Sequence, residues 1–191
     1  MCEIKDFFNS KAASWDSEIV IHADRIEYLI SLLDLQPFDR VLDVGCGTGV
    51  LEDFLPDDIR LMAIDFSQGM IDEARRKHPN VNYVVDDFLT MKTSAMCYDK
   101  IIMHNVFPHF LQPVFAVKKA YELLAPNGIL LICHSIGRSV INQRHSSISN
   151  RLSVSLPLVK ELAQEVEHHG FKVLQAEDEN DYYALKVQKT I

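Results

Sequence analysis

The sequence "VLDVGCGTGVL", from Val41 to Leu51, places three glycines at alternate positions directly after a short apolar run. Glycine adopts backbone conformations that other residues avoid, and it lets a ligand approach the main chain closely. The spacing G-x-G-x-G differs from the dinucleotide pattern G-x-G-x-x-G, and no Lys-Ser/Thr pair follows it as in a P-loop. The stretch therefore predicts a strand, a ligand-binding turn and the start of a helix.

Similar apolar runs recur along the chain and alternate with segments of helical spacing at 70–77, 113–124 and 158–169. This alternation predicts an α/β fold with a doubly wound, seven-stranded, mainly parallel sheet. Only "EDEND" separates the last two runs, which is too short for a crossover helix, so the last strand should be antiparallel to its neighbour. The expected strands are 40–44, 60–64, 81–85, 99–105, 128–133, 171–176 and 182–187.

The 191 residues are expected to form one domain, because no linker or internal repeat divides them. Two segments stand outside the alternation. Residues 1–36 are interpreted as a helical N-terminal cap, and residues 135–156 as a short lid insertion after the fifth strand.

Composition narrows the classes of partner. A hydrophobic fraction of 48% and a charged fraction of 24% are typical of a folded globular protein. The net charge of -8 weighs against nucleic acids and anionic membranes as partners. The chain shows neither an apolar run of about 20 residues nor a signal peptide, so a cytoplasmic location is expected. The four cysteines lack C-x-x-C spacing and predict neither a disulfide nor a zinc site.

Two acidic residues near the glycine turn indicate which chemical groups its ligand carries. Asp43 precedes the turn and would repel a phosphate but attract an amino group. Asp65 ends the next apolar run about 20 residues on, where an acidic side chain can accept hydrogen bonds from both ribose hydroxyls. The ligand so described has a ribose and an ammonium group and needs no phosphate.

With these motifs the sequence resembles the class I S-adenosylmethionine-dependent methyltransferases. "LDVGCGTG", "AIDFSQGMIDEAR", "VVDDFLTM" and "YELLAPNGILLIC" are similar to successive motifs of that family. The resemblance implies a Rossmann-like methyltransferase fold, with S-adenosyl-L-methionine as cofactor and S-adenosyl-L-homocysteine as product. It implies that Asp65 holds the ribose and that Asp87 reads the adenine amino group, although Asp86 could exchange roles with Asp87. The expected cofactor-binding residues are Asp43, Gly45, Cys46, Gly47, Gly49, Asp65, Phe66, Met70, Asp87, Phe88 and His104.

The methyl acceptor should lie at the carboxyl ends of the strands. His104 and Asn105 end one strand, and "HSIGRSVINQRH" follows the next. Arg138, Asn142 and His145 have helical spacing and would share one face, either solvated or clamping a polar or anionic acceptor. The catalytic candidates are His104, Asn105, His134 and His145, and the substrate-binding candidates are Trp15, His109, Arg138 and Asn142. His134, His145 and His22 could gather around a metal, but their spacing matches no known ligand pattern and no metal site is predicted.

The resemblance favours an enzyme that transfers the sulfonium methyl group to a small-molecule acceptor by in-line displacement. A sensor or partner subunit that binds the cofactor without chemistry is an alternative, as is a protein or RNA methyltransferase. Aminopropyl transfer is a weaker alternative. The chain is expected to be a monomer or a homodimer, without a nucleic-acid or membrane partner.

Overall fold

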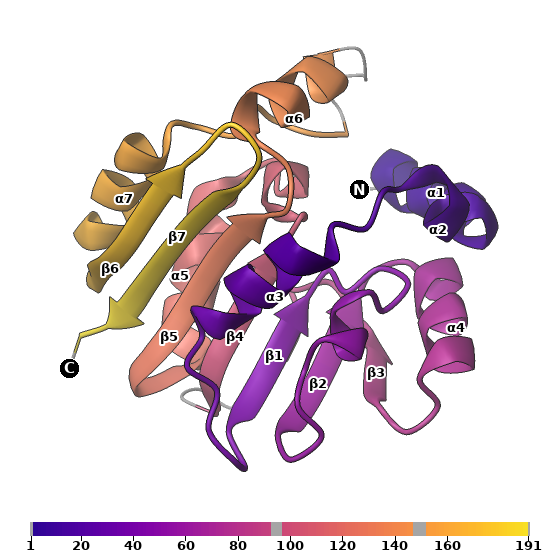
Figure 1. Cartoon of the computed structure of the whole chain (residues 1–191), viewed down its shortest axis with the longest axis horizontal. Helices are drawn as coiled ribbons and strands as arrows, with labels where there is room; N and C mark the ends of the chain where they lie inside the picture. Colours follow the sequence, from indigo (N-terminus) through magenta and orange to yellow (C-terminus); the bar gives the residue numbers. More distant parts are fainter. Residues whose placement is uncertain (1, 93–96, 147–151, 191) are drawn as a thin grey trace.

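The fold is built on one sheet of seven strands (Figure 1). The computed structural model describes residues 2–92, 97–146 and 152–190. Across the sheet the order is β3-β2-β1-β4-β5-β7-β6, and β7 runs antiparallel to both of its neighbours. The predicted mainly parallel sheet with an antiparallel last strand is thus confirmed. The strands are β1 (Arg40–Val44), β2 (Arg60–Asp65), β3 (Asn82–Val85), β4 (Tyr98–His104), β5 (Leu124–His134), β6 (Phe171–Asp178) and β7 (Tyr183–Lys189).

Helices cover both faces of the sheet (Figure 1). Successive side chains of a strand point to opposite faces. Accordingly, Leu131 of β5 packs in the core that contains α3, while Leu130 packs in the core that contains α5 and α7. The helices are α1 (Cys2–Lys11), α2 (Trp15–Glu18), α3 (Ala23–Ser31), α4 (Gln68–Lys77), α5 (Pro113–Leu123), α6 (Arg138–Ser146) and α7 (Val159–His168), with 3-10 turns η1 (Ala12–Ser14), η2 (Leu51–Asp53) and η3 (Phe107–His109).

The strand order changes direction between β1 and β4, so that successive strands are added on opposite sides of this point. From β1 the strand order runs outward to β2 and β3 on one side, and to β4 and β5 on the other. In open α/β sheets the carboxyl ends of the strands at such a point border the ligand crevice. The glycine turn, Asp65, His104 and His134 all lie at or just beyond these ends.

The segment after the glycine turn differs from expectation. The predicted helix is only the single 3-10 turn η2. Pro56 disfavours a helical backbone at the residue before it, and β2 already begins at Arg60. Too few residues remain between the glycine turn and β2 for a longer helix.

The expected N-terminal cap divides into two parts. Its second part, α3, is a core helix, with Ile26, Leu29 and Leu33 almost fully buried against the sheet. Its first part, α1 with η1, packs on α4 instead. There the Asn9 side-chain oxygen accepts a hydrogen bond from the backbone N–H of Gly69 at 3.0 Å. Residues 2–14 are therefore attached to the helix that follows Asp65.

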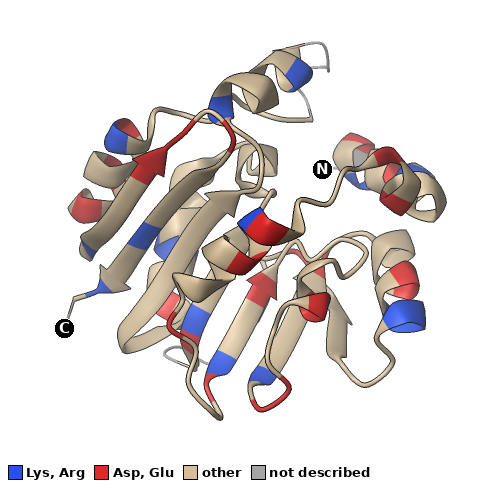
Figure 2. Cartoon of the chain, in the orientation of Figure 1, with Lys and Arg blue, Asp and Glu red and all other residues tan. Residues whose placement is uncertain are grey.

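Basic and acidic residues are interspersed in the view of Figure 2. On α4, Arg76 pairs with Glu73, and Lys77 pairs with Asp16 at 2.8 Å. The basic run of this helix is thus engaged by acidic neighbours. Within the described ranges, none of the helices has both the length and the apolar character needed to cross a membrane.

Candidate functional site

The glycine turn is tightly enclosed at two of its glycines and open at the third. Gly45, Gly47 and Gly49 all have positive φ. A Cβ at Gly45 would lie 2.3 Å from Val106 Cγ2, and one at Gly49 would lie 2.7 Å from the Tyr83 hydroxyl, whereas a Cβ at Gly47 would meet nothing within 4 Å. Space beside the backbone is therefore kept at Gly47, where a ligand can approach the main chain.

Asp43 lies beneath this turn as a buried acid without a partner. Its side chain is 1% exposed, and its Oδ2 accepts no hydrogen bond from the described residues. Burial raises the pKa of this carboxyl well above its ordinary value, and the nearby Glu52 and Asp65 raise it further. A cationic group placed here would relieve all three carboxyls.

Glu52 is a residue that the sequence reasoning missed. It lies on η2, and both of its carboxyl oxygens are buried without a hydrogen bond that meets normal geometry. Burial raises its pKa, while the Tyr83 hydroxyl beside it lowers it. An acidic residue in the apolar turn right after the last glycine was the available signal. The glycine turn is thus lined by three acids and not two.

Asp65 holds the glycine turn and also faces the cavity. Its Oδ2 accepts a hydrogen bond from Gly47 N at 3.0 Å, and its Oδ1 accepts one from Ser67 N at 2.8 Å. Burial raises the pKa of Asp65 to about 6, although both hydrogen bonds act in the opposite direction. The carboxylate is therefore fixed in place at the rim of the cavity.

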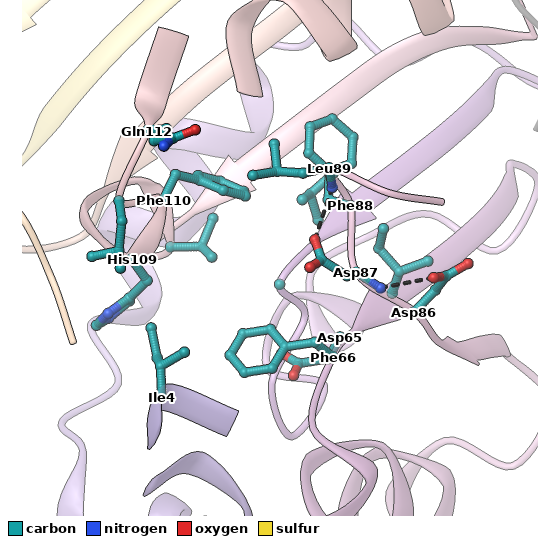
Figure 3. Close-up of a pocket in the computed structure, with 15 residues that line it drawn as sticks. Ile4, Asp65, Phe66, Asp86, Asp87, Phe88, Leu89, His109, Phe110 and Gln112 are labelled. Atoms are coloured by element: carbon teal, nitrogen blue, oxygen red, sulfur yellow. Dashed lines mark hydrogen bonds between the residues drawn. The ribbon is translucent and has the colours of Figure 1, made fainter. Parts of the chain in front are cut away.

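A cavity of about 300 Å³ opens beside Asp65 (Figure 3). Asp87 directs its carboxyl group toward this cavity, and its Oδ1 accepts a hydrogen bond from Leu89 N at 2.9 Å. Asp86 points away and accepts a hydrogen bond from Asp87 N at 2.8 Å. Of the two neighbouring acids, Asp87 is thus the one oriented toward a ligand in the cavity. The walls include Ile4, Gly45, Asp65, Phe66, Asp87, Phe88, Leu89, Val106, His109 and Phe110.

Six of the expected cofactor residues are not part of the wall of this cavity: Asp43, Cys46, Gly47, Gly49, Met70 and His104. Met70 is 1% exposed and packs inside α4, where its N–H donates to the Ser67 hydroxyl that caps the helix. Cys46 is buried at the back of the glycine turn, beside Ala63 and Tyr83. Both side chains support the turn and the helix behind the cavity.

The N-terminal segment closes one side of the cavity. Ile4 belongs to its wall, and the ring of Phe8 contacts Phe66 and His109 with centroids 5.9 Å and 5.0 Å apart. Trp15 packs against the outer side of Phe8 at 5.6 Å. Trp15 is therefore one ring removed from the cavity, and it supports Phe8.

Four histidines gather at the carboxyl ends of β4 and β5. His109 and His145 contact each other with ring centroids 5.2 Å apart. A charge on either of them, or on His104, would lower the pKa of His134, which burial already lowers well below its ordinary value. Burial also lowers the pKa values of His104 and His109 to about 4. The four imidazoles form a neutral polar group at ordinary pH.

Asn105 joins the ends of the two strands. Its backbone has a φ of 55°, and its side chain exchanges two hydrogen bonds with Ser135, one to the hydroxyl at 3.2 Å and one from the backbone N–H at 3.1 Å. Through these contacts, the Asn105 side chain links the end of β4 to the residue that follows β5.

The expected acceptor clamp on α6 is engaged elsewhere. Arg138 Nε donates to Asp178 at 2.6 Å. Asn142 exchanges two hydrogen bonds with the backbone of Leu156, at 2.9 Å and 2.8 Å. Both side chains attach α6 to neighbouring segments, so the polar face does not offer them to an acceptor. Residues 147–151 of the expected lid lie outside the described residues.

Among the residues that the structure describes, no cluster of three or more His, Cys, Asp or Glu side chains is arranged to hold a metal ion. Cys46, Cys97 and Cys133 form no disulfide within the described part of the chain.

Comparison with known proteins identifies the domain. Residues 41–128 match the family described as "Methyltransferase domain". The chain is 29% identical over 155 residues to the malonyl-[acyl-carrier protein] O-methyltransferase of Priestia megaterium, a match covering 77% of this chain and 56% of the relative. The chain spans about half the length of the curated relatives that it matches first.

Solved structures share the whole fold at low sequence identity. A chain of the Haloferax volcanii complex between the Trm112 methyltransferase activator and a methyltransferase aligns with a TM-score of 0.83 at 15% identity, covering 98% of this chain and 97% of that one. The N-methyltransferase NodS of Bradyrhizobium japonicum, solved with S-adenosyl-L-homocysteine, aligns with a TM-score of 0.69 at 17% identity, covering 87% and 86%. With the matched domain, the fold and the glycine turn in agreement, the chain belongs to the class I S-adenosylmethionine-dependent methyltransferases.

Proposed function

We propose that this chain transfers the methyl group of S-adenosylmethionine to a small-molecule acceptor. The observation that carries the proposal is the cavity beside the glycine turn, whose wall includes Ile4 of the N-terminal helix. A cavity of about 300 Å³ bordered by α1 suits a cofactor and a compact acceptor better than a macromolecular surface.

The side chains at hand fit the parts of this cofactor. The unpartnered, buried Asp43 Oδ2 is a hydrogen-bond acceptor for the ammonium group of the methionine moiety. Asp65 can accept hydrogen bonds from the ribose hydroxyls, and Asp87 can accept one from the adenine amino group. Phe66 and Phe88 supply apolar wall for the adenine ring.

The three acids favour a cation over a neutral product. Burial raises the pKa of Asp43, and the negative charges of Glu52 and Asp65 nearby raise it further. A ligand with two positive charges, ammonium and sulfonium, offsets that repulsion. Loss of the methyl group removes the sulfonium charge, so the product is held less tightly than the cofactor.

When bound, the cofactor supplies an activated methyl group, and the chain positions the acceptor beside it. Phe8 packs edge-on against Phe66 and His109 and so supports two residues of the cavity wall. Alignment of the acceptor with the methyl carbon is worth several kcal/mol of the barrier, because it replaces a random encounter by a fixed one.

The named relatives do not determine the acceptor. One is an O-methyltransferase and one an N-methyltransferase, and the chain spans 56% of the first. The chemical class of the acceptor therefore depends on the residues of this chain's own site.

The test is formation of S-adenosylhomocysteine when the purified chain, S-adenosylmethionine and the low-mass fraction of a cell extract are combined. We expect product that depends on both the chain and the fraction, and its loss in Asp65→Asn at the same cofactor concentration. Tight cofactor binding without product would favour the sensor or partner subunit.

A further inference from the structure

Four polar atoms at the carboxyl ends of β4 and β5 and in the segment after β5 are buried without a hydrogen-bond partner among the described residues. An unsatisfied buried polar atom costs about 1–3 kcal/mol, so a group of them calls for a ligand or a functional reason. The cofactor proposal accounts for Asp43 but does not use these atoms. They are His104 Nε2, His134 Nε2, His145 Nδ1 and Ser153 Oγ.

The strand register brings these groups together beside the glycine turn. Asp43 is paired with Ile102, so His104, two residues further along β4, stands level with Gly45. His104 is in turn paired with Cys133, the residue before His134. Val106, two residues beyond His104, packs directly on Gly45. His104 is thus the histidine at the cofactor end of the cluster.

The outer end of the cluster is covered by the segment after β5. The ring of His145 in α6 contacts that of His109 at a tilt of 50°, and His109 Nδ1 is 3.0 Å from the Leu152 carbonyl oxygen. Val154 N donates to Pro108 O at 2.8 Å and so fixes Ser153 above the turn η3. The polar atoms therefore extend from the glycine turn to the underside of α6.

The cluster is suited to an uncharged molecule. Burial lowers the pKa values of all four histidines, so the rings are neutral at ordinary pH. Arg138, the cation that the sequence offered for an anionic acceptor, is paired with Asp178. An anion or an ammonium ion would lose its hydration here without gaining an opposite charge.

We propose that the cluster of His104, His134, His145 and Ser153 binds the methyl acceptor, that the acceptor is a neutral compound attacking through an O–H or S–H group, and that His104 Nε2 receives its proton. This inference rests on the proposed methyltransferase function and specifies the acceptor class; the cluster adjoins the cavity at His109, which belongs to the cavity wall and contacts His145.

The step balances without a further reactant. The acceptor oxygen or sulfur forms a bond to the methyl carbon, the bond from that carbon to the sulfonium sulfur breaks, and its electron pair remains on S-adenosylhomocysteine. The proton of the O–H or S–H group moves to His104 Nε2, whose neutral ring carries its own proton on Nδ1. The imidazolium then releases the extra proton to solvent.

The weak basicity of these histidines argues for oxygen or sulfur over nitrogen. An O–H or S–H group becomes strongly acidic as its heteroatom bonds to the methyl carbon, so even an imidazole with a lowered pKa takes the proton. A methylated amine remains a weak acid and would keep its proton. An amine would also enter mainly as an ammonium ion, beside the cationic cofactor.

The attacking atom can be identified with the unaltered chain. Cofactor labelled with ¹³C at the methyl group is incubated with the chain and the low-mass fraction of an extract, and the ¹³C chemical shift of the product methyl is measured. An O–CH₃ or S–CH₃ signal supports the inference. An N–CH₃ or C–CH₃ signal overturns the acceptor class but leaves the proposed function intact, and no labelled product overturns both.

The role of His104 is tested on the acceptor so identified, by comparing His104→Gln with His168→Gln, a change at an exposed histidine of α7. We expect kcat to fall about 100-fold or more in His104→Gln, with cofactor affinity unchanged. The residual rate should rise with pH, because the acceptor must then ionise unaided. Equal pH profiles for His104→Gln and the native chain would contradict the proton transfer.

Discussion

The two sides of the cleft differ in how they are built. On the cofactor side, Asp65 is fixed by hydrogen bonds from Gly47 and Ser67, which lie in the turns that follow the consecutive strands β1 and β2. On the acceptor side, Arg138, Asn142 and Asn105 are all engaged with segments 14 to 40 residues away. The polar atoms left without a partner there belong to His104, His134, His145 and Ser153. A motif thus describes the first side well, while the second depends on tertiary contacts that no motif records.

The largest expected effect is at the glycine turn. Gly45→Ala should lower the free energy of unfolding by about 2–5 kcal/mol, because the new Cβ would clash with Val106 and alanine is strained at positive φ. Gly47→Ala is the matched control, with similar φ but open space, and should lose only about 1–2 kcal/mol. Urea unfolding of the apo proteins measures both. Equal losses would mean that the turn is less closely packed than described.

The next effect concerns cofactor affinity. Asp65→Asn should weaken binding of S-adenosylmethionine by about 1.5–3 kcal/mol, since a charged acceptor of hydrogen bonds is replaced by a neutral one. Asp86→Asn is the control, because Asp86 points away from the centre of the cavity. Calorimetric titration of both variants measures the two affinities, and a larger loss for Asp86→Asn than for Asp65→Asn would contradict the assignment of the ribose to Asp65.

A smaller effect is expected on the acceptor side. Arg138→Met should lower the free energy of unfolding by about 1–2 kcal/mol, as expected for a partly buried ion pair with Asp178. The KM for the acceptor should not change. A double-mutant cycle with Asp178→Asn measures the pair, and a raised acceptor KM in Arg138→Met would restore the clamp expected from sequence.

The mildest effect is on pH dependence. Burial raises the pKa of Asp65 to about 6, so in the free protein this carboxyl takes up a proton as the pH falls through that value. A cationic cofactor prefers the ionised form, and its affinity should decline by up to about tenfold per pH unit below pH 6. The same raised pKa makes Asp65's own contribution to stability larger at pH 5 than at pH 7. Titrations from pH 5 to 8 in two buffers would detect proton release on binding, and constant affinity would exclude Asp65 as the titrating group.

The sequence allowed the sheet and the cofactor side to be predicted, because the residues that decide them belong to patterned motifs at the ends of successive strands. Gly47 and Asp65 are 18 residues apart and belong to consecutive strand ends. Glu52 was missed although an acid in an apolar turn was a signal, because its burial beside Tyr83 depends on how η2 packs in the folded chain.

The sequence predicted that Arg138, Asn142 and His145 share one face of a helix, but it did not predict what that face contacts. Arg138 meets Asp178 across 40 residues, and His109 meets Leu152 across 43. Helical spacing identifies which side chains share a face, but it does not say what the face packs against. The anionic acceptor was therefore expected from an arginine that has a structural partner.

The most direct test of the account is the destination of the methyl group. S-adenosylmethionine carrying a labelled methyl is incubated with the chain and a whole extract, which is then separated into low-mass, protein and RNA fractions. The account predicts chain-dependent label in the low-mass fraction, reduced in Asp65→Asn. Label that accumulates in protein or RNA instead would contradict the small-molecule acceptor.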